Sequence, residues 1–267
     1  MDLLYSSGYA CSALEYASKD EIIYICGNGL VIQSLQNSSQ RVIRGTSFGI
    51  QGFAVNRKHG LVAVAEKGPN PAIHVYSVHD LQLLGSLHLD FPLGYTCLAL
   101  SADGERLAVC GEEPHARISV YAWRKAEHIV TADLPQRSGT ATSVSFHPYD
   151  GDRLAATLNT VGGQGSTHVW HIKRLWDRCE ITSKKVLMDL THPSSTHCWY
   201  PGGLYVGTST GHLYAALVLP PPLPAAPPPA HSTAPSTRAG ISRAISTCSD
   251  GGSVFLRAGA EGAKDGE

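Results

Sequence analysis

The sequence predicts an all-β protein built from repeated sheets of four antiparallel strands, and three observations lead to this prediction. Short apolar segments recur at intervals of 45 to 50 residues along the chain. They are rich in Val, Ile, Leu and Tyr, as strands are. Glycine pairs that suit tight turns separate them. Four antiparallel strands in a unit of about 40–45 residues are typical of a β-propeller blade.

The clearest landmark of each unit is an apolar segment that contains small residues. It begins at Val62, Leu107, Leu154 and Leu204, with intervals of 45, 47 and 50 residues. A first segment precedes it, beginning at Phe53, Leu98 and Val144, and a third segment follows it and contains Tyr76, Tyr121 and Trp170. The repeated order predicts the first, second and third strands of successive blades.

Glycine pairs mark the turns of these units. Asp103-Gly104 and Asp150-Gly151 lie between the first and second strands, and Asn28-Gly29, Thr210-Gly211 and Asp250-Gly251 lie between the second and third. We expect the glycines to take the positive φ that such hairpin turns require.

The pattern is less regular at both ends of the chain. The first unit shows three strands, at residues 22–26, 30–35 and 40–44, and residues 9–16 can supply another. The fourth unit contains a glycine loop at 161–166 and a polar insertion at about 173–185, and the fifth runs from 196 to about 219.

These units give the predicted domain organisation. Propeller blades occupy residues 1–218, a proline-rich disordered insertion 219–240, a partial blade hairpin 241–257 and a disordered tail 258–267. We expect five to six degenerate blades and an incomplete ring, since proline cannot replace ladder strands and propellers of this type usually have seven blades. The chain therefore resembles a fragment of a longer protein.

Composition excludes several classes of protein. Of the 267 residues, 43% are hydrophobic and 16% charged, and the net charge is −1. No run of five like charges occurs, which argues against binding nucleic acid or a membrane surface through a basic cluster. The N-terminus lacks the pattern of a secretory signal peptide. The seven cysteines, at 11, 26, 97, 110, 179, 198 and 248, form no CxxC pair and are expected to be reduced and buried.

No catalytic, cofactor-binding or metal-binding residue is assigned from the sequence. His168 and His171 are three apart on a strand and so point to opposite faces, and His192, His197 and Cys198 lack regular zinc spacing. The segment 162–166 has the composition of a phosphate loop but lacks the lysine. Glu112, Glu113 and Asp189 are isolated acids. We therefore expect no small-molecule substrate and no enzyme activity.

The units resemble WD40 repeats at Ser101-Ala102-Asp103-Gly104 and Phe146-His147-Pro148. The Trp-Asp dipeptide is absent from its usual position in the repeat. The residues at that position are Tyr76-Ser77, Tyr121-Ala122 and Trp170-His171. Trp176-Asp177 lies six residues too late and is attributed to chance. The sequence therefore predicts a WD40-like β-propeller whose repeats are degenerate.

A more specific resemblance covers about residues 8–218. The segments that carry it are 8–11, 23–31, 63–68, 71–73, 192–193, 197–199, 204–207 and 211–213. In these segments the chain resembles the cilia- and flagella-associated protein 43/44 family.

The resemblance implies propellers followed by long coiled coils in an axonemal tether. Such a tether holds inner-arm dynein heads to doublet microtubules and includes a paralogous WD-repeat subunit. Two departures from the family matter: this chain has no coiled coil, and its proline tract interrupts a blade.

Two other function classes stay open. One is a generic cytoplasmic WD40 adaptor that binds proteins on its rims, or through PxxP spacings in residues 219–240. The other is an enzyme carried on a propeller, which requires convergent polar groups at the central channel.

Overall fold

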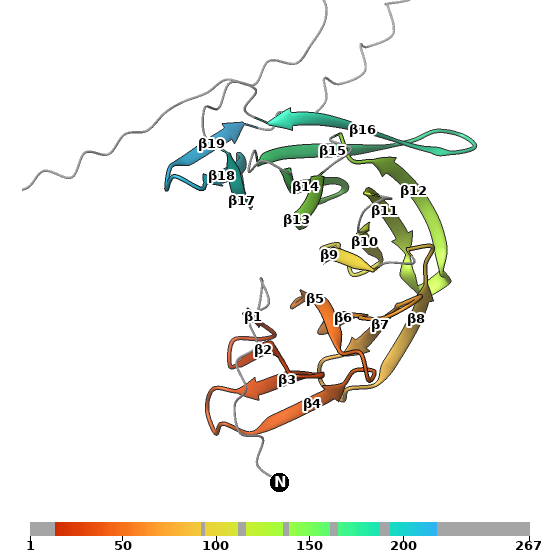
Figure 1. The fold of residues 1–267 in the computed structure, drawn as a ribbon, viewed down its shortest axis with the longest axis vertical. Coiled ribbons are helices and arrows are strands. Elements are labelled where there is room, and N and C mark those ends of the chain that lie inside the picture. Colours follow the sequence, from red (N-terminus) through yellow and green to blue (C-terminus); the bar gives the residue numbers. More distant parts are fainter. Residues whose placement is uncertain are drawn as a thin grey trace, which may run out of the picture.

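Five antiparallel sheets stand side by side in an arc (Figure 1), and the expected all-β propeller architecture is confirmed. The computed structural model describes residues 14–91, 94–111, 116–135, 139–160, 165–186 and 193–217. The proline tract at 219–240, the hairpin at 241–257 and the tail at 258–267 lie outside these ranges. In the described ranges, four sheets have four strands and the fifth has three.

Each sheet is one blade, with its strands hydrogen-bonded in chain order. Blade 1 contains β1 (Leu14–Tyr16), β2 (Glu21–Cys26), β3 (Gly29–Ser34) and β4 (Gln40–Arg44). Blade 2 contains β5 (Ile50–Asn56), β6 (Leu61–Glu66), β7 (Ala72–Ser77) and β8 (Leu83–His88). Blade 3 contains β9 (Tyr95–Leu100), β10 (Arg106–Gly111), β11 (Arg117–Ala122), the short 3₁₀ helix η1 (Trp123–Lys125) and β12 (Glu127–Asp133). Blade 4 contains β13 (Gly139–His147), β14 (Asp150–Thr160), β15 (Ser166–Arg174) and β16 (Cys179–Val186), and blade 5 contains β17 (Ser194–Tyr200), β18 (Gly203–Thr208) and β19 (Leu213–Leu217).

The second strand of each central blade is buried on both faces. All six residues of β10 are buried, and five of the six in β6. Both strands are continuous apolar runs, as expected for strands covered on two sides. Their alternation of Ala with Leu or Val brings small and large side chains to the neighbouring blades, which allows close packing.

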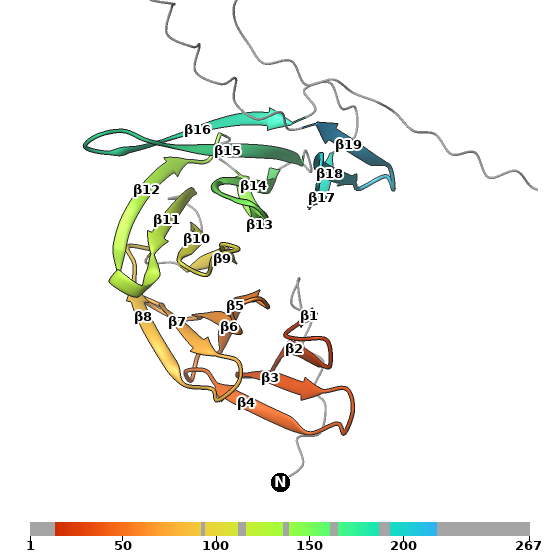
Figure 2. The same ribbon diagram turned by 180° about the vertical axis from the view of Figure 1, so that it is seen from behind.

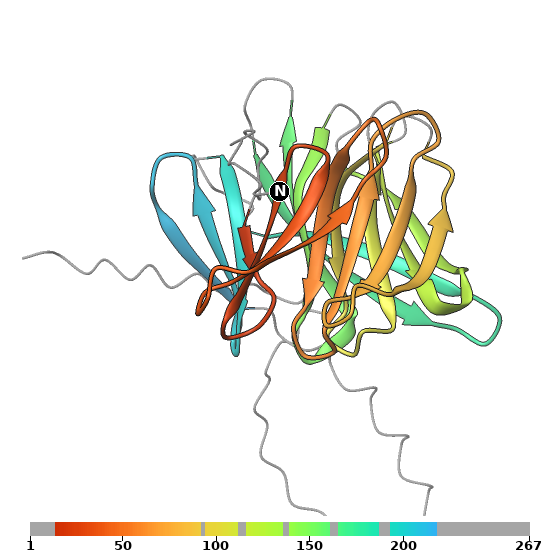
Figure 3. The ribbon, with the colours of Figure 1, turned by 90° about the horizontal axis from the view of Figure 1, so that it is seen from below.

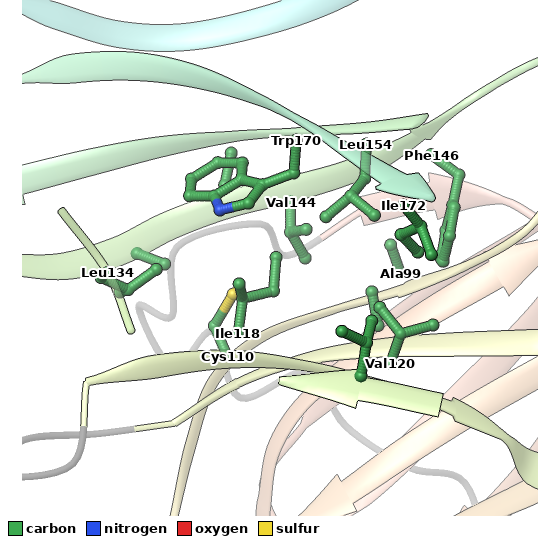
Figure 4. Close-up of a cluster of buried hydrophobic side chains, with 14 of the residues drawn as sticks. Ala99, Cys110, Ile118, Val120, Leu134, Val144, Phe146, Leu154, Trp170 and Ile172 are labelled. Carbon is green, nitrogen blue, oxygen red and sulfur yellow. The ribbon is translucent and has the colours of Figure 1, made fainter. Parts of the chain in front are cut away.

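Four clusters of buried hydrophobic side chains join successive blades. The largest joins blades 3 and 4 and contains Cys110, Ile118, Leu154 and Trp170 (Figure 4). The other three join blades 2 and 3, blades 1 and 2, and blades 4 and 5. Within the described residues no such cluster joins blade 5 to blade 1, and these blades form the two ends of the arc (Figures 1 and 2).

Polar side chains add links across the same boundaries. Asn56 of blade 2 donates from Nδ2 to the carbonyl of Ser101 in blade 3 at 2.6 Å, and the Tyr95 hydroxyl of blade 3 donates to the Pro71 carbonyl at 2.7 Å. Arg106 donates to the carbonyl of Gly151 and the carboxylate of Asp152 in blade 4, at 2.6 and 2.7 Å. These bonds satisfy buried polar groups where the apolar clusters end.

Two of the expected turn glycines behave as the sequence indicates. Gly104 has φ 75° and Gly211 has φ 85°. Asn28-Gly29 differs, because Gly27 takes the positive φ of 59° and Gly29 already begins β3. Asp150-Gly151 differs too, because Asp150 pairs directly with His147 in the ladder and residues 148–149 form the turn.

The structure corrects the interpretation of one further segment and supports that of another. Residues 173–185 are not an insertion: they end β15 and form most of β16, in an eight-pair ladder from Thr167–Val186 to Arg174–Cys179. Most residues of β16 are exposed and polar, so the segment lacks the apolar run by which a strand is recognised in a sequence. The strand expected within residues 9–16 of blade 1 is present as β1, Leu14–Tyr16, and residues 9–13 lie outside the described ranges.

The cysteines only partly follow expectation. None of the five described cysteines forms a disulfide. Cys110 is buried, and its hydrogen bond with Cys97, together with burial, raises the pKa of the Cys110 thiol. Cys198, expected to be buried, is exposed on β17.

Two buried tryptophans in neighbouring blades differ in one hydrogen bond. Trp123 Nε1 donates to the Gly104 carbonyl at 2.7 Å, whereas Trp170 Nε1 has no partner among the described residues. We expect Trp123→Phe to lower the free energy of unfolding by about 1–3 kcal/mol more than Trp170→Phe, because it leaves a carbonyl unpaired. Urea denaturation of both variants measures the difference. Equal losses would show that the bond to Gly104 contributes nothing.

Candidate protein-interaction site

The described histidines considered as metal ligands lie on two strands, β15 and β17. His168 and His171 both belong to β15 and face opposite sides, His168 being buried. His197 and Cys198 are neighbours on β17, where His197 is turned toward blade 4 and Cys198 is exposed. His192, Glu112, Glu113 and Asp189 lie outside the described residues, as does most of the glycine loop. No group of three His, Cys, Asp or Glu side chains suited to a metal occurs among the described residues.

His197 links blade 5 to blade 4. Its Nε2 lies 2.8 Å from the Ser145 hydroxyl, and its Nδ1 lies 2.7 Å from the Thr157 hydroxyl and 3.3 Å from that of Ser143. A neutral imidazole donates from one nitrogen and accepts at the other. Burial lowers the pKa of His197 to about 4, so the ring is neutral at pH 7. The hydroxyls satisfy the hydrogen-bonding groups of the imidazole, and the ring therefore links blade 5 to blade 4.

The most exposed large apolar side chain of the described residues lies elsewhere, on the hairpin formed by β15 and β16. This hairpin extends beyond the other blades at the outside of the arc (Figures 1 and 3). Trp176 at its tip is fully exposed, and Leu175 beside it is 45% exposed. The backbone N–H of Leu175 donates to the carbonyl of Arg178 at 2.8 Å, which closes the turn.

A groove of about 570 Å³ lies between this tip and the edge of blade 3. One wall is the hairpin tip, from Arg174 to Cys179. The other wall is formed by the end of β11, η1 and the start of β12, and by the residues at the start of β10. Ala122 and Ile129 give this wall an apolar part between charged side chains.

Arginines held by carboxylates surround the groove. The Asp152 carboxylate binds buried Arg106 at 2.7 Å and exposed Arg174 at 3.5 Å. Arg178 pairs with Glu180 at 2.7 Å. On the opposite wall, Arg124 lies 4.4 Å over the Trp123 ring and 3.7 Å from Glu105.

The hairpin is more basic than the protein as a whole. Residues 173–185 carry five basic and two acidic side chains, a net charge of +3, whereas the whole chain carries −1. The rest of the chain therefore carries −4. The exposed tryptophan and the local excess of positive charge together mark this hairpin tip and groove as the candidate interaction site.

One signal for this site is present in the sequence, the pair Trp176-Asp177, which the repeat pattern alone attributes to chance. Trp176-Asp177 lies out of phase with the repeat because it occupies the turn beyond the third strand. A tryptophan in a turn bounded by Arg174 and Arg178 was the usable signal, since an exposed tryptophan is uncommon in a turn. The opposite wall could not be foreseen, since it comes from residues some 50–70 positions earlier in the chain.

Comparisons with known proteins agree with the fold and the repeat pattern. The chain is 39% identical over 245 residues to cilia- and flagella-associated protein 43 of Chlamydomonas reinhardtii, covering 77% of this chain and 14% of that protein. The chain belongs to the cilia- and flagella-associated protein 43 and 44 family. It is 26% identical over 176 residues to cilia- and flagella-associated protein 44 of Mus musculus, covering 64% of this chain and 9% of that protein. Cilia- and flagella-associated protein 251 of Pongo abelii is 22% identical over 175 residues, covering 60% of this chain and 14% of that protein.

The chain thus spans only a small part of these relatives. Among solved structures, Hsv2 of Kluyvelomyces marxianus superposes with a TM-score of 0.54 at 14% identity, covering 67% of this chain and 62% of that one. KlHsv2 with loop 6CD replaced by a Gly-Ser linker gives a TM-score of 0.52 at 14% identity, covering 64% and 57%. These likenesses concern the fold alone. A scan against protein-family models finds no match, and no helix in the described ranges is long and apolar enough to cross a membrane.

The buried histidines predict how stability depends on pH. Burial lowers the pKa of both His197 and His168 to about 4, with Lys185 adding to the effect at His168. An unfolded histidine takes up its proton near pH 6.5. Between pH 6.5 and 4 the unfolded chain therefore binds more protons, so the free energy of unfolding falls as the pH falls through this range.

Urea denaturation at several pH values measures this dependence. His197→Gln should be less stable at pH 7.5 and show a flatter decline between pH 6.5 and 4. The exposed control His88→Gln should retain the decline of the unmodified protein. An unchanged slope in His197→Gln would refute the assignment to His197.

Proposed function

We propose that this protein is a non-enzymatic scaffold of the ciliary and flagellar axoneme. It would act as a WD-repeat component of a tether that holds inner-arm dynein heads to doublet microtubules, and so supports motility. Its partners would be a paralogous WD-repeat subunit, inner-arm dynein and the doublet microtubule. The observation that carries the ciliary part is the 39% identity over 245 residues to cilia- and flagella-associated protein 43.

The structure supports a scaffold through its geometry. Shared apolar cores join the blades, and the candidate interaction site lies at the outer edge of the arc, where its hairpin tip projects from the boundary between blades 3 and 4. His197, whose three hydroxyl contacts superficially resemble a serine–histidine pair, is half-buried and linked to two strands of blade 4. Its geometry suits a link between blades rather than attack on a substrate.

A second candidate is a cytoplasmic adaptor that binds proteins through its rim. The exposed hairpin tip would serve such an adaptor equally well. The two candidates differ in location, because only the first requires assembly onto the axoneme.

Location is therefore the test. The protein, tagged in a ciliated cell and co-expressed with its paralogue, should remain in axonemes after detergent extraction of the membrane. Proximity labelling should mark inner-arm dynein and tubulin. A tagged cytosolic protein of similar size is the control and should be lost on extraction. A tagged protein that never enters the axoneme would contradict the proposal and favour the adaptor.

A further inference from the structure

Trp176 has the exposure and the ordered backbone that are typical of an anchor residue in a protein interface. Its ring is fully exposed, and the hydrogen bond between Leu175 and Arg178 together with the β15–β16 ladder fixes the turn that carries it. Tryptophan and arginine are enriched among residues that dominate interface energies. A side chain presented by an ordered turn loses little further freedom when a partner covers it.

The groove has room for a peptide segment. Its volume of about 570 Å³ falls within the range of ligand sites in proteins. It is open along the hairpin and has apolar surface at Ile129 and Leu175 between charged groups. A segment lying in it would contact both walls and cover Trp176.

The charges around the groove favour an acidic segment. Arg174 and Arg178 have side chains 63% and 66% exposed, and each is paired with a carboxylate on one side only. A guanidinium has five N–H donors, so each retains donors for a further carboxylate. Lys125 and Lys173, also exposed, have no ion-pair partner among the described residues. The hairpin's net charge of +3 would attract such a segment from solution.

A uniformly anionic surface fits less well. Glu105, Glu127 and Asp177 also line the groove, and they would lie against the phosphates of a membrane or a nucleic acid. A peptide can instead place its carboxylates opposite the arginines and an apolar residue opposite Trp176.

We propose that the groove between the β15–β16 hairpin tip and the edge of blade 3 binds an extended acidic peptide segment of a protein partner. An apolar side chain of that segment covers Trp176, and its carboxylates pair with Arg174 and Arg178. This inference rests on the proposed scaffold function and names the chemistry of one partner.

Fluorescence anisotropy with the full 267-residue chain tests the proposal. The probe is a labelled peptide of about ten residues, glutamates around a central phenylalanine, which spans about 35 Å when extended. A peptide with lysines in place of the glutamates is the control probe. We expect binding of the acidic peptide only, weakening as salt is raised.

Variants locate the site. Trp176→Ala should weaken binding about tenfold or more, as removal of an interface anchor does, whereas Phe48→Ala, which removes an exposed aromatic ring near blades 1 and 2, should leave it unchanged. Arg174→Glu with Arg178→Glu should abolish binding. The double variant Lys58→Glu with Lys67→Glu makes the same change in net charge at exposed positions in the β5–β6 and β6–β7 connections of blade 2, and should retain binding. All these side chains are exposed, and circular dichroism confirms folding.

Several outcomes would overturn the inference. They are failure to bind the acidic peptide, equal binding of the lysine peptide, and binding that Trp176→Ala leaves unchanged. Tighter binding to phosphatidylserine vesicles or to single-stranded DNA than to the peptide would also overturn it. Failure here with the protein still found in axonemes would refute this site alone, whereas absence from axonemes would refute the proposed function.

Discussion

The fold depends on the packing of each blade's apolar face against the next blade. A single blade cannot bury its apolar faces on its own, so it depends on its neighbours for stability. Here the second strands, such as β6 and β10, contribute side chains to clusters on both sides, so one strand helps to stabilise two boundaries. Stability is therefore shared between neighbouring blades, and a change at one boundary affects both blades that form it.

Polar bonds at these boundaries take on more weight because the repeats lack the usual Trp-Asp dipeptide. Asn56, Arg106 and His197 each reach from one blade to a group on another. No two of these links use the same chemistry: an amide, a guanidinium and a neutral imidazole appear in turn. In these degenerate repeats, individual polar links therefore stand in place of one repeated polar network. The apolar clusters hold the blades against one another.

The same physics explains how much could be read from the sequence. The second strands at Val62, Leu107 and Leu154 are predictable because burial on both faces makes their apolar runs unmistakable. The one at Leu204 is predictable from its spacing, although Tyr205 leaves one of its faces exposed. The outer strands were harder: β16 is mostly exposed, so its lysines and serine read as an insertion. The sequence predicts Trp170 as the aromatic residue of a third strand. It does not predict that the indole nitrogen has no hydrogen-bond partner among the described residues, because such partners come from neighbouring blades. The groove was beyond reach, because it joins residues 105–106, 122–129 and 174–179.

The location of the hairpin tip separates binding from folding. Trp176 belongs to no apolar cluster, so its ring contributes area to a partner without being needed by the blade cores. Arg106, by contrast, lines the groove and also joins blade 3 to blade 4. One wall of the groove is therefore part of the boundary between blades 3 and 4, and the other wall, the hairpin tip, projects from that boundary. Its rigid side fixes the position of Arg174 through the shared Asp152 carboxylate, and its projecting side presents the tryptophan. A site of this kind can be altered at its tip without loss of the fold, whereas alteration at Arg106 affects both.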